Sequence, residues 1–279
     1  MRVIIDGEPF DSSVAAISVF DWALIRGLAV FEVVRVYGSS LFRLGAHLDR
    51  LAASAAALAI AFPERGALVA DMSRVASSSG DGQVRVILTS GGRDPEASAP
   101  PRVVVMWEPL PTVPDGVSVF PVIAPWHPAT VESGFPGVKW TSYAPNMAVT
   151  DRVRRLGFDD ALLTTTDGIV LEGPTFTYAW MRHGRLETPS LDLGILPSIT
   201  RDVILECAGQ LGLPVSEGRF PLAAVLDADE VLALSTVKQV TPVVRVGDHQ
   251  VPGGPLSGSL SAAFARVVAA EIAAAGATP

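Results

Sequence analysis

The stretch 137–178 constrains the fold more than any other part of the chain, because it combines signals for a helix and for a hairpin. It reads GVKWTSYAPNMAVTDRVRRLGFDDALLTTTDGIVLEGPTFTY. Residues 142–156 carry apolar side chains at near-helical spacing, and Gly157 follows them as a helix C-terminal glycine does. Residues 161–171 then form two short apolar runs around an Asp-Gly pair. This pattern predicts a hairpin that ends at Glu172.

The same stretch contains Lys139, one of only two lysines in the chain, which has nineteen arginines. A lysine ammonium group can lose its proton at a site that lowers its pKa, whereas an arginine guanidinium stays charged. A lysine in such a sequence therefore indicates a chemical task. Lys139 stands just before the predicted helix and Glu172 at the end of a predicted strand, which indicates a lysine and a glutamate with separate functions.

Composition limits the classes of protein to consider. With 279 residues and 49% hydrophobic content, the chain can bury a large core in one large or two ordinary domains. A net charge of -8 argues against nucleic-acid binding through a basic surface, and small-molecule partners are expected. Cys207 is the only cysteine, so no intrachain disulfide can form. We expect no leader, no membrane span, no metal site and a cytoplasmic location.

The segment 109–116 has three prolines and a glycine, and we interpret it as a domain boundary. We therefore predict an N-terminal domain at 1–114 and a larger C-terminal domain at 115–279 that carries Lys139.

The order Lys, Tyr, Asn, Gly-Phe-Asp-Asp-Ala, Asp-Gly and Glu-Gly-Pro in the stretch 137–178 resembles the class IV aminotransferases. These are the fold-type IV pyridoxal-phosphate enzymes, which include branched-chain and D-amino-acid aminotransferases and aminodeoxychorismate lyase. Six upstream residues also match the family pattern, so that the resemblance covers nearly the whole chain: Asp21, Gly27, Phe31, Glu32, His47 and Arg50. It implies an α+β fold with a smaller N-terminal α/β domain, a larger C-terminal domain and the cofactor at the domain interface.

The resemblance also implies roles around pyridoxal 5'-phosphate. Lys139 holds the cofactor covalently and moves a proton on the substrate. Glu172 lies at the pyridine nitrogen and keeps it protonated. Tyr143 contacts the phenolic oxygen of the ring, and its spacing of four residues from Lys139 predicts that it lies one helical turn away.

Phosphate binding is implied for four residues. Arg50 can hold a phosphate through two parallel, charge-assisted hydrogen bonds. Ile199 and Thr200 begin a predicted helix that runs to Gln210, and a helix N-terminus is a natural anion site. Thr236 follows a predicted strand and completes the set.

Several residues depart from the family pattern. Arg26 replaces an aromatic residue of the substrate pocket, and it is either a cation for a substrate carboxylate or an arginine on the surface or a dimer interface. Ser90 takes the place of an arginine that binds a carboxylate, and Arg93 in the next loop is a second candidate. Phe31 is the third candidate substrate contact. His127, in a Pro-rich loop, is interpreted as a polar surface residue more readily than as an acid–base group.

Three functions follow from the resemblance. The first is a transaminase that moves an amino group between an amino acid or amine donor and a 2-oxo acid acceptor. The second is a lyase that eliminates pyruvate from aminodeoxychorismate, and the third is a protein that binds the cofactor without turnover. A homodimer is also implied, and the apolar residues Trp22, Leu24 and Leu28 near the cofactor motif agree with an interface.

Overall fold

The computed structural model describes residues 2–77, 80–92, 99–130 and 135–276, and they form two compact units. Unit 1 comprises Met1–Pro111, Val138–Tyr143 and Ala270–Pro279. Unit 2 comprises Thr112–Gly137 and Ala144–Ala269. The division differs from the predicted one in its middle part, because Lys139 and its neighbours belong to unit 1 and not to the C-terminal unit.

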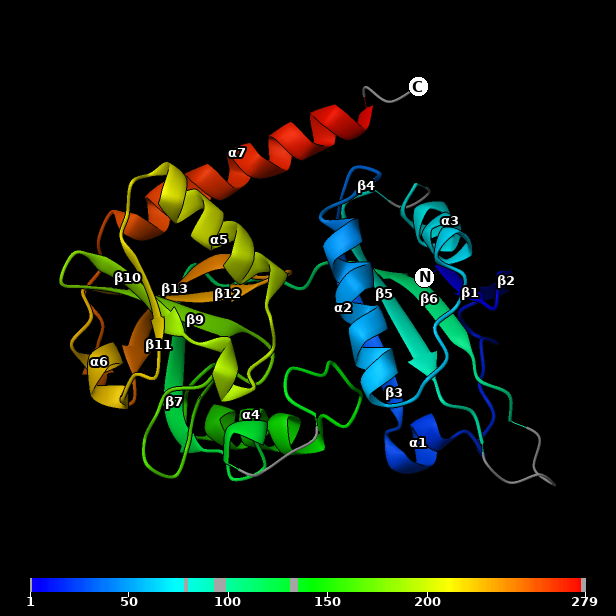
Figure 1. Ribbon diagram of the computed structural model, residues 1–279, viewed down its shortest axis with the longest axis horizontal. Coiled ribbons are helices and arrows are strands. Elements are labelled where there is room, and N and C mark those ends of the chain that lie inside the picture. Colours follow the sequence, from blue (N-terminus) through cyan, green and yellow to red (C-terminus); the bar gives the residue numbers. More distant parts are fainter. Residues whose placement is uncertain (1, 78–79, 93–98, 131–134, 277–279) are drawn as a thin grey trace. The chain divides into compact units, whose positions relative to one another are not determined.

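Unit 1 is built on a six-stranded antiparallel sheet with the order β2-β1-β6-β5-β3-β4 (Figure 1). Its strands are β1 (Arg2–Ile5), β2 (Glu8–Asp11), β3 (Ala29–Tyr37), β4 (Ser40–Leu41), β5 (Gly82–Thr89) and β6 (Val103–Glu108). Its helices are α1 (Trp22–Arg26), α2 (Leu44–Ala57) and α3 (Arg65–Ala76).

Helices α2 and α3 cover one face of this sheet, and the pattern of β3 explains how. Alternate residues of a strand point to opposite faces, and Val30, Val34 and Val36 belong to the core between the sheet and the two helices. Glu32 stands in the same inward row and is 1% exposed. Leu48 and Leu51 of α2 are also fully buried there. A carboxylate therefore occupies a position in an otherwise apolar row.

Unit 2 is built on an eight-stranded mixed sheet with the order β11-β10-β9-β12-β13-β7-β8, in which β14 also pairs with β13. Its strands are β7 (Val117–Ile123), β8 (Asp160–Thr164), β9 (Thr177–Arg182), β10 (Arg185–Pro189), β11 (Val215–Gly218), β12 (Glu230–Ser235), β13 (Gln239–Val246) and β14 (His249–Gln250). Its helices are α4 (Ala144–Arg155), α5 (Ile199–Gln210), α6 (Leu222–Leu226) and most of α7 (Leu256–Gly276), whose residues from Ala270 on belong to unit 1, with 3-10 turns at Pro128–Thr130 and Leu191–Leu193.

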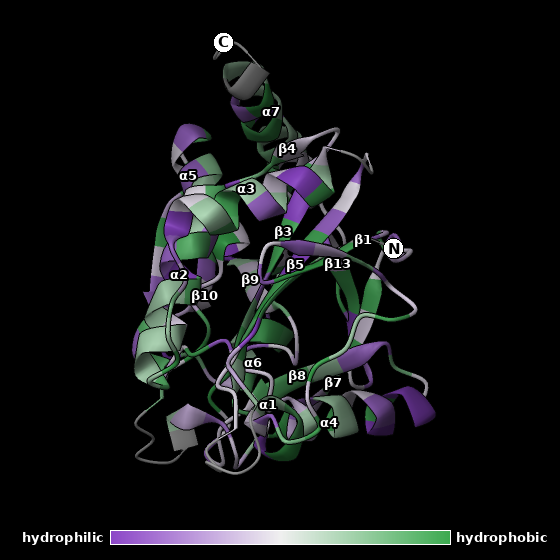
Figure 2. Ribbon diagram, turned by 90° about the vertical axis from the view of Figure 1, so that its right-hand side faces the viewer, coloured by the Kyte–Doolittle hydropathy of each residue, from purple (hydrophilic) through white to green (hydrophobic). Residues whose placement is uncertain are grey.

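The sheet of unit 2 is covered on both faces. The neighbouring residues Leu162 and Leu163 of β8 point to opposite faces and belong to two different apolar clusters, one with α6 and one with α4. Figure 2 shows hydrophobic residues along the strands. Continuous apolar runs are typical of strands buried on both sides, which explains why β8 carries no polar alternation.

Helix α7 bears on the expectation about membrane spans. We expected no uninterrupted apolar span of membrane length; Leu256–Ala274 contains Arg266 and Glu271, but it is long and apolar enough to cross a membrane by length and composition alone. One such helix is weak evidence, because a packed helix of a soluble protein has the same properties. Leu256, Leu260, Phe264 and Val268 are buried at helical spacing, which is the pattern of a helix that packs one face on a protein core.

Candidate active site

Lys139 is held by its backbone on two sides within unit 1. Its carbonyl accepts a hydrogen bond from the amide of Phe31 at 3.0 Å, and the next residue forms a bridge with Val30, so that the segment extends the edge of β3. Its own amide donates to the hydroxyl of Ser54 on α2 at 3.1 Å. These bonds explain why Lys139 belongs to unit 1, and they fix the point from which its side chain extends.

Two aromatic rings lie beside the amine of Lys139. The Nζ atom is 4.5 Å from the ring centroid of Phe31 and 6.0 Å from that of Tyr143. The rings themselves meet edge to face, with centroids 5.5 Å apart. The expectation that Tyr143 lies one helical turn after Lys139 is wrong, because α4 begins only at Ala144. An extended segment and a turn, in which the Tyr143 amide donates to Thr141, bring the two residues together.

The second group in unit 1 is a buried cluster of Glu32, His47 and Arg50. The residues His47 and Arg50 are three apart on α2 and therefore share one face of the helix. Arg50 donates from Nε to Oε1 of Glu32 at 2.6 Å and from Nη2 to Oε2 at 2.8 Å. The Nδ1 atom of His47 lies 2.8 Å from Oε2. The side chains of Glu32 and His47 are 1% and 2% exposed.

Charge balance in this cluster follows from burial and pairing. Burial alone raises the pKa of Glu32, but the charge and hydrogen bonds of Arg50 and the hydrogen bond of His47 outweigh it and leave that pKa far below its ordinary value. Burial lowers the pKa of His47 in spite of the opposing effect of Glu32, and the positive charges of Arg50 and Lys139 lower it further. The cluster therefore contains a carboxylate, a guanidinium and a neutral imidazole that donates from Nδ1.

In unit 2, the carboxylate of Glu172 has two hydrogen-bond partners, an imidazole and a backbone amide. The Nε2 atom of His127 lies 3.1 Å from Oε1, and the amide of Leu196 donates to Oε2 at 3.2 Å. The amide of Ala129 donates to Nδ1 of His127 at 3.1 Å. The interpretation of His127 as a surface residue is wrong, since it is 5% exposed. Its loop folds inward and places it on a carboxylate 45 residues later in the sequence.

The N-terminus of α5 provides a second group in unit 2. Ser198 is the N-cap, and its hydroxyl accepts a hydrogen bond from the amide of Arg201 at 3.3 Å. Ile199 and Thr200 are the first two helical residues, so the helix itself leaves their amides unpaired. Thr236 is half-buried and follows directly after β12.

The three candidate substrate residues, Phe31, Arg26 and Arg93, have different surroundings. Phe31 lies against Lys139, as described above. Arg26 is exposed in the last turn of α1, and Gly27 ends that helix in the left-handed region at φ 66°. A side chain at Gly27 would meet the hydroxyl of Ser142, whose Oγ donates to the Gly27 carbonyl. Arg93 lies outside the described residues. The substrate roles of these residues stay predictions.

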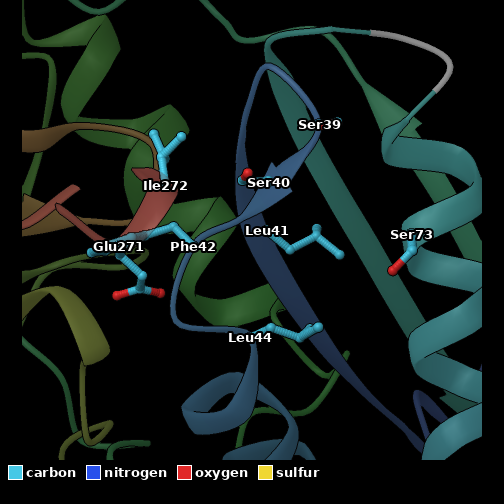
Figure 3. A pocket seen from close by; sticks show the side chains of 8 residues that line it. All are labelled: Ser39, Ser40, Leu41, Phe42, Leu44, Ser73, Glu271 and Ile272. Atoms are coloured by element: carbon cyan, nitrogen blue, oxygen red, sulfur yellow. The ribbon is translucent and has the colours of Figure 1, made fainter. Parts of the chain in front are cut away.

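One small hollow of about 160 Å³ lies elsewhere in unit 1 (Figure 3). It is lined by residues of β4, the start of α2, and α3 and α7, including Leu41, Leu44 and Glu271. Glu271 is paired there with Arg43 at 3.1 Å. Pockets for small molecules usually have volumes of about 300–1,000 Å³, and none of the candidate residues lines this hollow. It is therefore not a candidate substrate site.

The chemistry of the two sets of donors fits pyridoxal phosphate. In unit 2, Thr200 at a helix N-terminus and Thr236 are donors of the kind that a phosphate dianion accepts, and in unit 1 the guanidinium of Arg50 is another. A protonated pyridine nitrogen suits a carboxylate that pairs with no lysine or arginine among the described residues, which describes Glu172. An amine beside two aromatic rings suits a covalent link to a planar ring, and Lys139 has that surrounding.

Comparisons with known proteins agree with this fit. The family model described as amino-transferase class IV matches residues 29–246. The chain is 31% identical over 256 residues to a putative branched-chain-amino-acid aminotransferase of Methanocaldococcus jannaschii, covering 88% of each. It is 29% identical over 301 residues to a bifunctional aminodeoxychorismate lyase / D-amino acid transaminase of Mycobacterium tuberculosis, covering 98% of this chain and 99% of that protein.

Solved structures give the same result for the fold. A hypothetical aminotransferase from Mycobacterium tuberculosis in its PLP-bound form superposes with a TM-score of 0.86 at 25% identity, covering 95% of this chain and 99% of that one. The chain therefore belongs to the class IV aminotransferase family and has the fold-type IV architecture. It is a pyridoxal-phosphate-dependent transaminase, and the predictions of family, fold class, cofactor and activity are confirmed.

Proposed function

We propose that Lys139 carries the cofactor covalently and moves the proton during amino transfer between an amino acid or amine and a 2-oxo acid. The observation that carries this proposal is the fixed backbone of Lys139, bound to β3 and α2, with its amine beside Phe31 and Tyr143. When bound, pyridoxal phosphate supplies a ring that accepts the electron pair left on the donor's α-carbon. The amine of Lys139 takes up and returns the proton of that carbon.

The other residues bind and orient. Glu172 holds the proton on the pyridine nitrogen, and Tyr143 donates to the phenolic oxygen. Arg50, Thr236 and the amides of Ile199 and Thr200 bind the phosphate. A dianion can accept several hydrogen bonds at once, and charge-assisted bonds are the strongest of them.

Lys238 offers a matched control, because it is the only other lysine. It lies 3.9 Å from the ring centroid of Phe176 and 3.8 Å from a carboxylate oxygen of Asp160, and burial lowers its pKa. Borohydride reduction and peptide mapping should place the pyridoxyl group on Lys139. Lys139→Ala should bind the cofactor without a covalent link and lose transamination, whereas Lys238→Ala should keep both. Labelling of Lys238 would refute the assignment.

The lyase is a second candidate, because relatives of this chain include an aminodeoxychorismate lyase of Bacillus subtilis, 28% identical over 287 residues. An added amino acceptor separates the two activities. Keto acid formed from an amino donor only when a 2-oxo acid is present indicates transamination. Pyruvate released from aminodeoxychorismate without an acceptor indicates the lyase, and neither product would favour a protein that only binds the cofactor.

We also propose a homodimer that works in the cytoplasm. Apolar side chains near α1 are exposed, among them Val19 at 65%, Phe20 at 56%, Leu24 at 63% and Ile25 at 45%. Contiguous exposed apolar residues commonly mark interfaces. Trp22 and Leu28, which we expected in the same patch, are half-buried. Sedimentation of the holoenzyme tests the proposal, and an active monomer would contradict it.

A further inference from the structure

We propose that His127 is the positioning residue for Glu172, and that it acts as a neutral donor whose proton is fixed on Nε2. The inference rests on the proposed role of Glu172 at the pyridine nitrogen and adds the residue that makes this role possible. The observations that carry it are three hydrogen bonds within unit 2 and the burial of the imidazole.

The tautomer of His127 follows from a single contact. The backbone amide of Ala129 always donates, and it points at Nδ1 from 3.1 Å. A nitrogen that accepts a hydrogen bond cannot carry a proton of its own, so the ring proton is on Nε2. That proton is the one directed at Oε1 of Glu172, 3.1 Å away. The main chain thus determines which way the imidazole donates.

The loop that carries His127 is tied to the segment of Glu172 a second time. The indole nitrogen of Trp126 donates to Oδ1 of Asn146 at 2.9 Å, and Nδ2 of Asn146 donates to the carbonyl of Pro174 at 3.1 Å. The amide of His127 itself donates to the carbonyl of Ala124 at 3.0 Å. His127 thus contacts Glu172 directly, and its neighbour Trp126 is linked through Asn146 to Pro174, two residues further on.

The lack of charge on the donor is the functional point. Glu172 has one oxygen bound by His127 and the other by the amide of Leu196, and no lysine or arginine among the described residues pairs with it. Two neutral donors orient the carboxylate but leave its negative charge uncompensated. A carboxylate in this state attracts a cation, and the protonated pyridine nitrogen is that cation. An arginine in place of His127 would instead neutralise the charge.

Amide side chains give a matched set of variants. The nitrogen of glutamine can take the place of Nε2, whereas the shorter asparagine reaches only the place of Nδ1. His127→Gln therefore keeps a donor to Glu172, and His127→Asn and His127→Leu remove it. We expect kcat to fall about ten- to a hundredfold in the Asn and Leu variants, the range for loss of a hydrogen bond to a charged group. The Gln variant should recover most of it, with KM for the donor little changed.

Two readouts do not depend on turnover. Nitrogen NMR of the cofactor-free protein, with the signal assigned by its absence in His127→Gln, should show His127 as the Nε2–H tautomer. In enzyme loaded with pyridoxal phosphate labelled at the ring nitrogen, the nitrogen shift should report a protonated ring in wild type and His127→Gln. It should report loss of that proton in His127→Asn, His127→Leu and Glu172→Gln.

The results separate this inference from the proposed function. An Nδ1–H tautomer, or a ring nitrogen that stays protonated in His127→Asn and His127→Leu while Glu172→Gln removes the proton, would overturn the role of His127 alone. Equal losses in the Gln and Asn variants would also overturn it, because the donor would then not be the cause. A ring nitrogen indifferent to Glu172→Gln would overturn the proposed role of Glu172, and the positioning role with it.

Discussion

Each unit of the chain pairs a glutamate with a buried histidine, and the two pairs differ in what else touches the carboxylate. In unit 1, Arg50 grips both oxygens of Glu32, and His47 adds a bond from Nδ1. In unit 2, the groups that bind the Glu172 carboxylate among the described residues are His127 and a backbone amide, and its side chain is 19% exposed against 1% for Glu32.

The difference shows what each carboxylate can do. Glu32 is committed to Arg50, so its charge is compensated inside the unit and serves to orient a guanidinium. Glu172 is oriented by neutral groups, so its charge is available to a ligand. The same residue types thus give a structural ion pair in one place and a ligand-binding carboxylate in the other, and the identity of the partner decides which.

The largest expected effect comes from removing the charge of each glutamate in turn. Glu32→Gln leaves Arg50 largely buried without its counter-ion, and breaking a buried pair in this way costs about 3–5 kcal/mol of unfolding free energy. Among the described residues no lysine or arginine pairs with Glu172, so Glu172→Gln leaves no cation without its partner and should cost about 1 kcal/mol, the scale of one imperfect hydrogen bond. Urea unfolding of the cofactor-free proteins measures both.

Transamination, unlike stability, should depend strongly on Glu172. Glu172→Gln folds normally but loses most of its transamination, because the pyridine nitrogen loses its partner. If Glu32→Gln and Glu172→Gln lost the same unfolding free energy, the distinction between a carboxylate paired with an arginine and one left available to a ligand would be wrong.

A smaller effect, on cofactor affinity, is expected when the cation of the unit 1 cluster is removed. Arg50→Ala should weaken cofactor binding about a hundredfold, because it deletes a charged donor, whereas Thr236→Ala should weaken it only a few-fold, since charge-assisted bonds are roughly twice as strong as neutral ones. Dissociation constants from absorbance titration give the ranking. The reverse order would show that Arg50 serves only Glu32.

The sequence predicted the elements better than the contacts. The apolar patterns located α4 and β8 to within a few residues, because burial of one or both faces determines such a pattern, and the helix predicted from Ile199 to Gln210 matches α5. The patterns could not show that Glu32 lies in the inward row with a compensating arginine, since His47 and Arg50 are 15 and 18 residues away in sequence. The sequence feature that points to the cluster of Glu32, His47 and Arg50 is the His-x-x-Arg spacing, which places both side chains on one helix face.

Two further contacts had no local signal. The role of His127 depends on a carboxylate 45 residues later and on the amide of Ala129, neither of which composition or spacing reveals. The link between Lys139 and unit 1 depends on backbone bonds to β3, more than 100 residues earlier in the sequence. Only the folded chain brings these groups together.

A further prediction concerns the charge of Arg26, which is either available to a substrate carboxylate or placed outside the substrate site. It is exposed in the last turn of α1. If it binds a substrate carboxylate, Arg26→Leu should raise KM about ten- to a hundredfold for alanine, the value of a charged hydrogen bond, and leave 1-phenylethylamine unchanged. Equal effects on the two donors would place Arg26 outside the substrate site and leave Arg93 as the candidate.

The smallest effect is a dependence of stability on pH that comes from unit 1. Burial lowers the pKa of His47 in the folded protein below its ordinary 6.5, so the unfolded chain takes up a proton below about pH 6.5 that the folded chain does not. Stability is therefore full above this pH and falls on acidification, by at most about 1.4 kcal/mol per pH unit for one proton. The pKa of Glu32 is lowered as well, so the same sign holds again below its ordinary 4.5.

The test replaces His47 by asparagine, whose amide can take the place of the Nδ1 donor without titrating. His47→Asn should flatten the slope of the urea midpoint between pH 7 and pH 5. The same replacement at the exposed His249 serves as the control. The two buried histidines thus require opposite amides, asparagine at 47 and glutamine at 127, because one donates from Nδ1 and the other from Nε2. A slope unchanged in His47→Asn would show that the acid sensitivity arises outside this cluster.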